Sequence, residues 1–324
     1  MKAKKSGFLK WIVLLVIFAV AMIFIFNRDK VYDYYRGLVY KPSAMMAQIR
    51  TDLNLTAKGE FLFNSAQPVL SEREEFNENC RASGNEIAIL GCYTNLNIYV
   101  YNIEDKQLDG IRELTAAHEL LHVVYAKMNT DERMAMKQDL EQVYKENREF
   151  LEDELDIYVG TERYEELYVR AGTEVKNLPQ NLEEHYAKIF RNQDKVVDFY
   201  DKYIAVFRRL EAELKALEVE LDNLDAEINN KTNEYERRVA EYSVRVNEFN
   251  NCADTAGCFI TEVSFNASRT ELLNERAEIE SLYDELTDLV AKYNELVQKY
   301  NNYILETEHL NNKINSNIKP KEIE

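Results

Sequence analysis

The sequence predicts a mainly helical α+β protein. A small domain with a β-hairpin and a buried helix comes first, and a long antiparallel coiled-coil hairpin follows it. Glycine and proline are scarce, with 9 and 4 in 324 residues, which favours long helices and few turns. Two β-rich runs lie between residues 85 and 103, ahead of an apolar helical segment. Two heptad stripes then occupy most of the chain beyond residue 195.

The N-terminal segment predicts a membrane anchor. An apolar run from Trp11 to Phe26 follows lysines at positions 2, 4, 5 and 10. A helix over residues 8–26 would span a hydrocarbon core of roughly 30 Å, and the lysines predict a cytoplasmic N-terminus with the remaining chain outside. We therefore expect a single-pass protein of the cell membrane, with lysines and anchor in residues 1–30. A signal peptide cleaved near 19–21 is the alternative, although it would leave the apolar "MIFIF" exposed.

The four cysteines fall into two closely spaced pairs. An extracytoplasmic location is oxidising, so we expect disulfides Cys80–Cys92 and Cys252–Cys258. Four free thiols in a reducing compartment are the alternative, and neither pair has the C-x-x-C spacing of metal-binding cysteines. The net charge of −18 argues against a nucleic-acid partner, because phosphate backbones select basic surfaces.

A juxtamembrane segment, residues 31–58, is expected to be partly helical and broken at "KPSA", and a compact domain over residues 59–194 follows it. The apolar "GEFLFN" (59–64) predicts a short strand, and "NEIAILGCY" and "NIYVYNI" predict the hairpin. A helix should begin near Ile111. One long helix is then expected over 131–160, a shorter one should end at Gly172, and another run begins at Gln180.

Residues 195–315 are expected to form the coiled-coil arm, and residues 316–324 a tail. Between the two stripes the periodicity fails at "NCADTAGCFITEVSFN" (251–266), where Gly257 and the six-residue cysteine spacing suit a chain reversal closed by a disulfide. The reversal favours a monomeric arm, and two helices of a longer parallel oligomeric coil are the alternative. The apolar positions of the stripes are Leu210, Leu214, Leu217, Leu221, Leu224, Ile228, Tyr235, Val239, Tyr242, Val246 and Phe249, then Ile279, Leu282, Leu286, Leu289, Tyr293, Leu296, Tyr300 and Tyr303.

The expected buried helix carries the pattern H-E-x-x-H in "LTAAHELLHVVYAKM" (114–128). His118 and His122 are four residues apart, so both imidazoles project from one helix face and can bind the same Zn²⁺. Glu119 is placed to activate water rather than to bind the metal. The alternative is an ordinary helix with polar residues on a wet face, but its neighbours are small and apolar, and an unpaired buried carboxylate is costly.

At these residues the chain resembles the zincin metallopeptidases. Tyr125 and Met128 stand where the metzincin subgroup continues its motif, so the resemblance is to the gluzincins, thermolysin among them, which take a later glutamate as third ligand. The segment "EELYVRAG" is similar to their N-E-x-x-S-D-x-x-G helix, with Glu166 at the ligand position and Glu165 in place of the asparagine. Glu174 is the rival ligand, and Glu166 can also form an ion pair with Arg170. Further alternatives for the ligand are His185 and the acidic residues at 152–154.

The resemblance implies a zinc-dependent endopeptidase acting on peptide or protein substrates. Glu119 would be the general base, and His185 and Tyr186 are candidate donors to the oxyanion. The alternative is a structural or adhesive envelope protein in which the arm functions and the metal-binding domain is inactive.

Overall fold

The computed structural model describes residues 10–15, 18, 22, 27–80 and 89–317, without the side chains of 153 and 154. No helix within these ranges is both long and apolar enough to cross a membrane. The predicted anchor at 8–26 lies mostly outside the described residues. The chain divides into two compact units, residues 1–206 with 310–324 and residues 207–309, and each is described by itself.

The first unit holds a three-stranded sheet. Strands β1 (Val69–Ser71), β2 (Gly91–Thr94) and β3 (Asn97–Tyr101) lie in the order β1-β3-β2. Strands β2 and β3 pair antiparallel, and the two residues between them, Asn95 and Leu96, both have positive φ, as a tight two-residue hairpin turn requires. This confirms the predicted hairpin, in shorter strands. Strand β1 joins β3 in parallel.

The sequence-based prediction for "GEFLFN" is wrong. These residues belong to helix α4 (Ala57–Ser65), which follows α2 (Arg28–Val39) and α3 (Ala44–Asp52). A short apolar run does not distinguish a buried strand from a buried helix. Here the side chain of Thr56 accepts a hydrogen bond from the Gly59 amide and caps the helix. Gly59 also lies too close to the Ile189 carbonyl for any side chain, an approach that a sequence pattern does not encode.

The single helix predicted over 131–160 is also wrong, because it divides at Asn147. The structure has α7 (Thr130–Glu146) and α8 (Arg148–Leu155), and the Asn147 side chain donates to the Val143 carbonyl at the junction. Gly160 does not end this run but begins α9 (Gly160–Glu174), with φ of 60°. The unit also contains α5 (Arg73–Asn79), a 3₁₀ turn (Lys106–Leu108), α6 (Ile111–Ala126) and α10 (Gln180–Tyr186).

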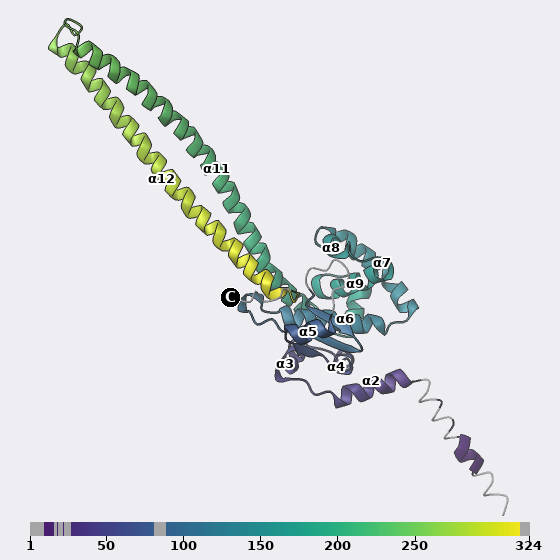
Figure 1. Ribbon diagram of the computed structural model, residues 1–324. Helices are drawn as coiled ribbons and strands as arrows, with labels where there is room; N and C mark the ends of the chain where they lie inside the picture. The colour runs from purple at the N-terminus through teal and green to yellow at the C-terminus, as the bar shows by residue number, and fades with distance from the viewer. Residues whose placement is uncertain (1–9, 16–17, 19–21, 23–26, 81–88, 318–324) are drawn as a thin grey trace, which may run out of the picture. The chain divides into compact units, whose positions relative to one another are not determined.

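Helix α6 is the centre of the first unit. It packs against β2 and β3 on one side and against α9 on another (Figure 1). Gly172 of α9 lies where a Cβ would stand 2.5 Å from Leu121 of α6 and 2.6 Å from the Tyr186 ring. Only glycine fits here without displacing these two side chains, so Gly172 sets how closely α9 packs against Leu121 of α6. The Cys80–Cys92 disulfide, with Cα atoms 5.8 Å apart, joins the end of α5 to β2 as predicted.

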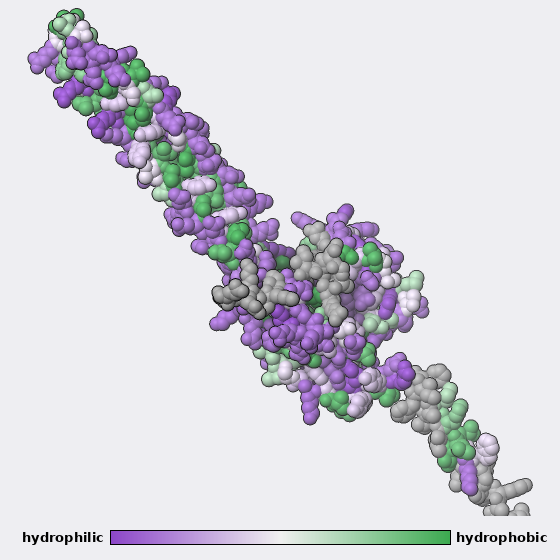
Figure 2. All heavy atoms as spheres, in the orientation of Figure 1, coloured by the Kyte–Doolittle hydropathy of each residue, from purple (hydrophilic) through white to green (hydrophobic). Residues whose placement is uncertain are grey.

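The second unit is a pair of antiparallel helices, formed by the parts of α11 (Asp194–Ala253) and α12 (Glu262–Ile314) within 207–309. Ion pairs connect them, and as one partner advances along α11 the other retreats along α12: Arg209–Glu306, Lys231–Glu285, Arg238–Glu278 and Arg245–Glu275. Leu217, Leu224, Ile279 and Leu282 of the predicted stripes are buried. Figure 2 shows the apolar residues as green between purple charged ones. The predicted helical hairpin is therefore confirmed.

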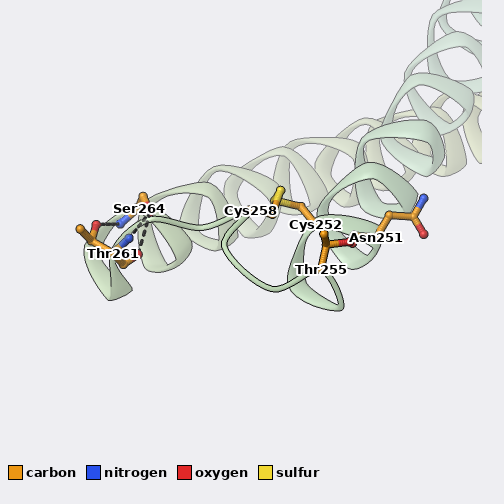
Figure 3. Close-up of a disulfide and its surroundings, with 6 residues drawn as sticks. All are labelled: Asn251, Cys252, Thr255, Cys258, Thr261 and Ser264. Atoms are coloured by element: carbon orange, nitrogen blue, oxygen red, sulfur yellow. Dashed lines mark hydrogen bonds between the residues drawn. A yellow bond between two sulfur atoms is a disulfide. The ribbon is translucent and has the colours of Figure 1, made fainter.

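The turn between α11 and α12 is closed by the predicted Cys252–Cys258 disulfide, with Cα atoms 5.2 Å apart (Figure 3). The start of α12 is capped by reciprocal contacts: the Ser264 amide donates to Thr261 Oγ1, and the Thr261 amide to Ser264 Oγ. A small apolar cluster packs within the turn. It consists of the rings of Phe249, Phe259 and Phe265, whose centroids are 5.2–5.3 Å apart.

Candidate metal centre

Three side chains from two packed helices meet at one point. His118 and His122 lie one turn apart on α6, with their Nε2 atoms 3.3 Å apart. Helix α9 brings Glu166 to them: Oε1 lies 3.8 Å from His118 Nε2, and Oε2 lies 3.6 Å from His122 Nε2. The glycine contact between α6 and α9 is what allows this approach. The three residues form a group that could hold a metal ion, with ligand atoms all within 4.8 Å of one another.

The group fits a zinc ion in both chemistry and dimensions. Two imidazole nitrogens and a carboxylate are ligands that zinc accepts. Bonds of about 2.0–2.1 Å to the corners of a tetrahedron put the ligand atoms roughly 3.4 Å apart, close to the 3.3–3.8 Å found here. The Glu166 side chain is only 4% exposed, while each histidine is about a fifth exposed. The group thus combines one buried carboxylate with two partly exposed imidazoles at the spacing that a zinc ion requires.

Glu165, next to the third residue of the group, orients His122. Its Oε1 lies 2.9 Å from His122 Nδ1, so the ring keeps its proton there and turns Nε2 toward the group. A carboxylate on the far nitrogen of a metal-binding histidine fixes its tautomer and makes the imidazole a better ligand. In the sequence, Glu165 is only a departure from the gluzincin helix, and its position next to a candidate ligand is the one signal of this role.

Arg170 separates the roles of the two candidate glutamates. Its Nε donates to Glu166 Oε1 at 2.7 Å, and its Nη1 donates to Glu174 Oε1 at 3.1 Å. Glu166 therefore has the predicted ion pair and also belongs to the group with the histidines. Glu174 lies two turns beyond Glu166 on α9 and pairs with Arg170, outside the group. The guanidinium thus orients Glu166, with Glu174 as its counter-ion.

Without a bound metal, the pKa values of His118, His122 and Glu166 are shifted by burial and by the charges that these residues place on one another. Burial, with the cationic groups nearby, lowers the pKa of His118 to about 3. Burial also opposes the charge on His122, but hydrogen bonds with Glu165 and Glu166 outweigh it and raise the pKa to about 10. Burial likewise raises the pKa of Glu166, yet the two histidines and Arg170 outweigh it and hold the pKa well below the usual range. A metal ion would displace the His122 proton as it binds.

Glu119 lies on α6 beside the first histidine and is 5% exposed. Strand β2 passes directly over it: a Cβ on Gly91 would stand 2.7 Å from Glu119 Oε1 and 2.6 Å from Thr115 Cγ2. Only a residue without a side chain permits this approach. Gly91 therefore confines the Glu119 carboxylate between strand and helix. Nothing in the local sequence marks Gly91 for this role, because the requirement comes from packing.

The other predicted site residues make contacts of a different kind. His185 Nε2 is 3.0 Å from the Tyr168 hydroxyl, and the Tyr186 hydroxyl donates to the Tyr168 carbonyl at 2.6 Å. Tyr186 is completely buried, at the contact with Gly172. Glu152 pairs with Arg148 on α8, and the side chains at 153 and 154 lie outside the described residues.

Comparison of the chain with models of protein families, with curated proteins and with solved structures finds no match. The group itself therefore carries the functional argument.

Proposed function

We propose that this protein is a zinc-dependent peptidase of the gluzincin kind, with His118, His122 and Glu166 as ligands. The convergence of these three side chains, with Glu119 directly following the first, is the observation that carries the proposal. Glu165 supports it, because an orienting carboxylate behind His122 is what a metal-binding histidine needs and an ordinary helix pair does not.

In this proposal the protein's own groups divide the work. Bound zinc would supply Lewis acidity to a peptide carbonyl and to the attacking water. A carboxylate oxygen of Glu119 takes the proton from that water and later gives it to the leaving amine. The close approach of Gly91 confines this carboxylate on the strand side of α6. Glu165 and Arg170 keep His122 and Glu166 oriented, so that neither ligand has to reorganise. His185 and Tyr186 are the proposed donors to the oxyanion. To act in this way, each would exchange its contact with Tyr168 for a hydrogen bond to the substrate.

We further propose that the domain works outside the cytoplasm, attached through residues 8–26. The two disulfides support the oxidising compartment, because such bonds persist where thiols are not kept reduced. The apolar run Trp11–Phe26 and the preceding lysines support the anchor and its orientation.

Cleavage of a broad peptide library by the full chain tests the function. The wild type should cut peptides, and a zinc chelator should stop it. Glu119→Gln should be inactive with its metal retained, because an amide cannot accept the water's proton. Glu184→Gln, an exposed glutamate of α10, is the matched control and should cut normally. If wild type and Glu119→Gln both bind zinc and both leave the library intact, the structural envelope function replaces the peptidase.

A further inference from the structure

Helix α2 turns its polar side toward the protein and its apolar side outward. The only residues of α2 that the protein partly covers are Asp33, Arg36 and Gly37, and they share one face. A surface helix ordinarily does the reverse and packs its apolar stripe against the core. The outward side chains, with their exposed fractions, are Val31 at 40%, Tyr32 at 49%, Tyr34 at 65%, Tyr35 at 60%, Leu38 at 73% and Val39 at 44%.

Polar contacts fix this orientation of α2. Arg36 donates from Nε to the Ser65 carbonyl at 2.8 Å, and from Nη2 to the Leu96 carbonyl at 2.9 Å and to Asn97 Oδ1 at 2.6 Å. Gly37 faces α4, where a Cβ would stand 3.5 Å from the Ser65 amide, at an ordinary contact distance. The helix lies along α4 (Figure 1). The outward apolar face is therefore held in place by contacts on the opposite side.

We propose that this outward face of α2 lies on the membrane surface, in the layer between lipid headgroups and acyl chains. The proposal rests on the proposed anchor: α2 begins at Arg28, two residues after the apolar run ends at Phe26. The chain therefore enters α2 where it would leave the bilayer. A helix with apolar residues on one side and charged residues on the other lies in this layer, with its apolar side about 5–10 Å deep.

The composition of the face matches a lipid interface better than a protein pocket. Three of its six side chains are tyrosines, whose rings and hydroxyls suit a boundary that is apolar on one side and wet on the other. Arg28 and Lys30, both exposed, can extend to the headgroups. The helix has five charged residues, so it lies on the bilayer and does not cross it.

This contact would place the metal centre close to the bilayer. Asp33 of α2 forms an ion pair with Lys127, the residue that caps the end of α6. The helix of His118 and His122 is thus tied to the helix on the lipid.

Fluorescence quenching in vesicles tests the position of α2. Trp11 is the only tryptophan, so the full chain with Trp11→Phe can carry one new reporter. Tyr35→Trp and, one turn later, Leu38→Trp report the outward face. Tyr283→Trp, 54% exposed on α12, is the matched control. Each protein is reconstituted in phosphatidylcholine vesicles whose lipids have bromine near the headgroups or near the chain ends.

Tyr35→Trp and Leu38→Trp should lose roughly half their emission, and more with bromine near the headgroups, because the face is expected only ~5–10 Å deep. Tyr283→Trp should be unaffected. If neither α2 reporter is quenched while Trp11 of the wild type is, the anchor stands and the α2 proposal is wrong. If Trp11 is not quenched either, the anchor is wrong too. Equal quenching of Tyr283→Trp overturns the proposal, because it shows nonspecific adsorption. Whether the protein cleaves peptides is measured in a separate assay, so none of these quenching results decides the proposed peptidase function.

Discussion

Replacing Gly172 by alanine should both destabilise the first unit and weaken its metal site. The new Cβ would lie 2.5 Å from Leu121 Cδ1 and 2.6 Å from Tyr186 Cε1. Carbon atoms in favourable contact are about 3.5–4.0 Å apart, so α9 and α6 would have to separate by roughly 1 Å. The ring cannot turn aside, because Tyr186 is fully buried and its hydroxyl donates to the Tyr168 carbonyl. Overpacking of this kind costs about 1–3 kcal/mol.

The same displacement should carry Glu166 away from the two histidines, since the ligands come from the two helices that are forced apart. We expect zinc affinity to fall roughly tenfold or more, as it does when support for a ligand is lost. Denaturant unfolding of the metal-free protein and competition with a zinc chelator measure the two effects. Gly37→Ala is the control: its Cβ meets only ordinary contacts in α2, so it should be stabilising by about 0.4–1 kcal/mol. Equal behaviour of the two variants would refute the reasoning.

Three further predictions concern single contacts. Glu165→Ala should lower zinc affinity roughly 10–100-fold, because His122 Nδ1 loses its carboxylate. Glu174→Ala should leave zinc bound, and a chelator titration in which Glu174→Ala loses zinc while Glu165→Ala retains it would contradict both assignments. Burial lowers the pKa of His185 from 6.5 to about 4, so its neutral form stabilises the fold above pH 6.5, and that stability is lost as pH falls toward 4. Between pH 6.5 and 4, the free energy of unfolding of metal-free His185→Gln should decrease less than that of the metal-free wild type. Equal decreases in the two proteins would refute this prediction. Cys252→Ser should cost roughly 2–3 kcal/mol on the chain-entropy account, read from unfolding of the arm, and an unchanged midpoint would contradict it.

The main elements and the two histidines of the metal group could be predicted from the sequence because both depend on local spacing. Heptad stripes specify long helices, and two histidines four residues apart share a helix face wherever they occur. The choice between Glu166 and Glu174 could not be made in this way. They are eight residues apart on α9 and lie on similar sides of it, and only the α6–α9 contact brings the first of them to the histidines.

Features that depend on approach between distant segments left no mark in the local pattern. Residues 59–64 have the apolar character of a strand, but the Thr56 cap and the Ile189 carbonyl make them helical. Gly91 is one of nine glycines, and its importance comes from the Glu119 carboxylate that packs against it in space. The reversed polarity of α2 likewise becomes visible only when its contacts with the protein are known.

The zinc content of the purified chain tests the central claim most directly. Elemental analysis after reconstitution should find a single zinc ion in the wild type and in Glu119→Gln. His118→Ala and Glu166→Ala should lose it, because each removes a ligand from the group. Wild-type protein that binds no zinc, or a Glu166→Ala variant that holds it as tightly as the wild type, would contradict the site as described.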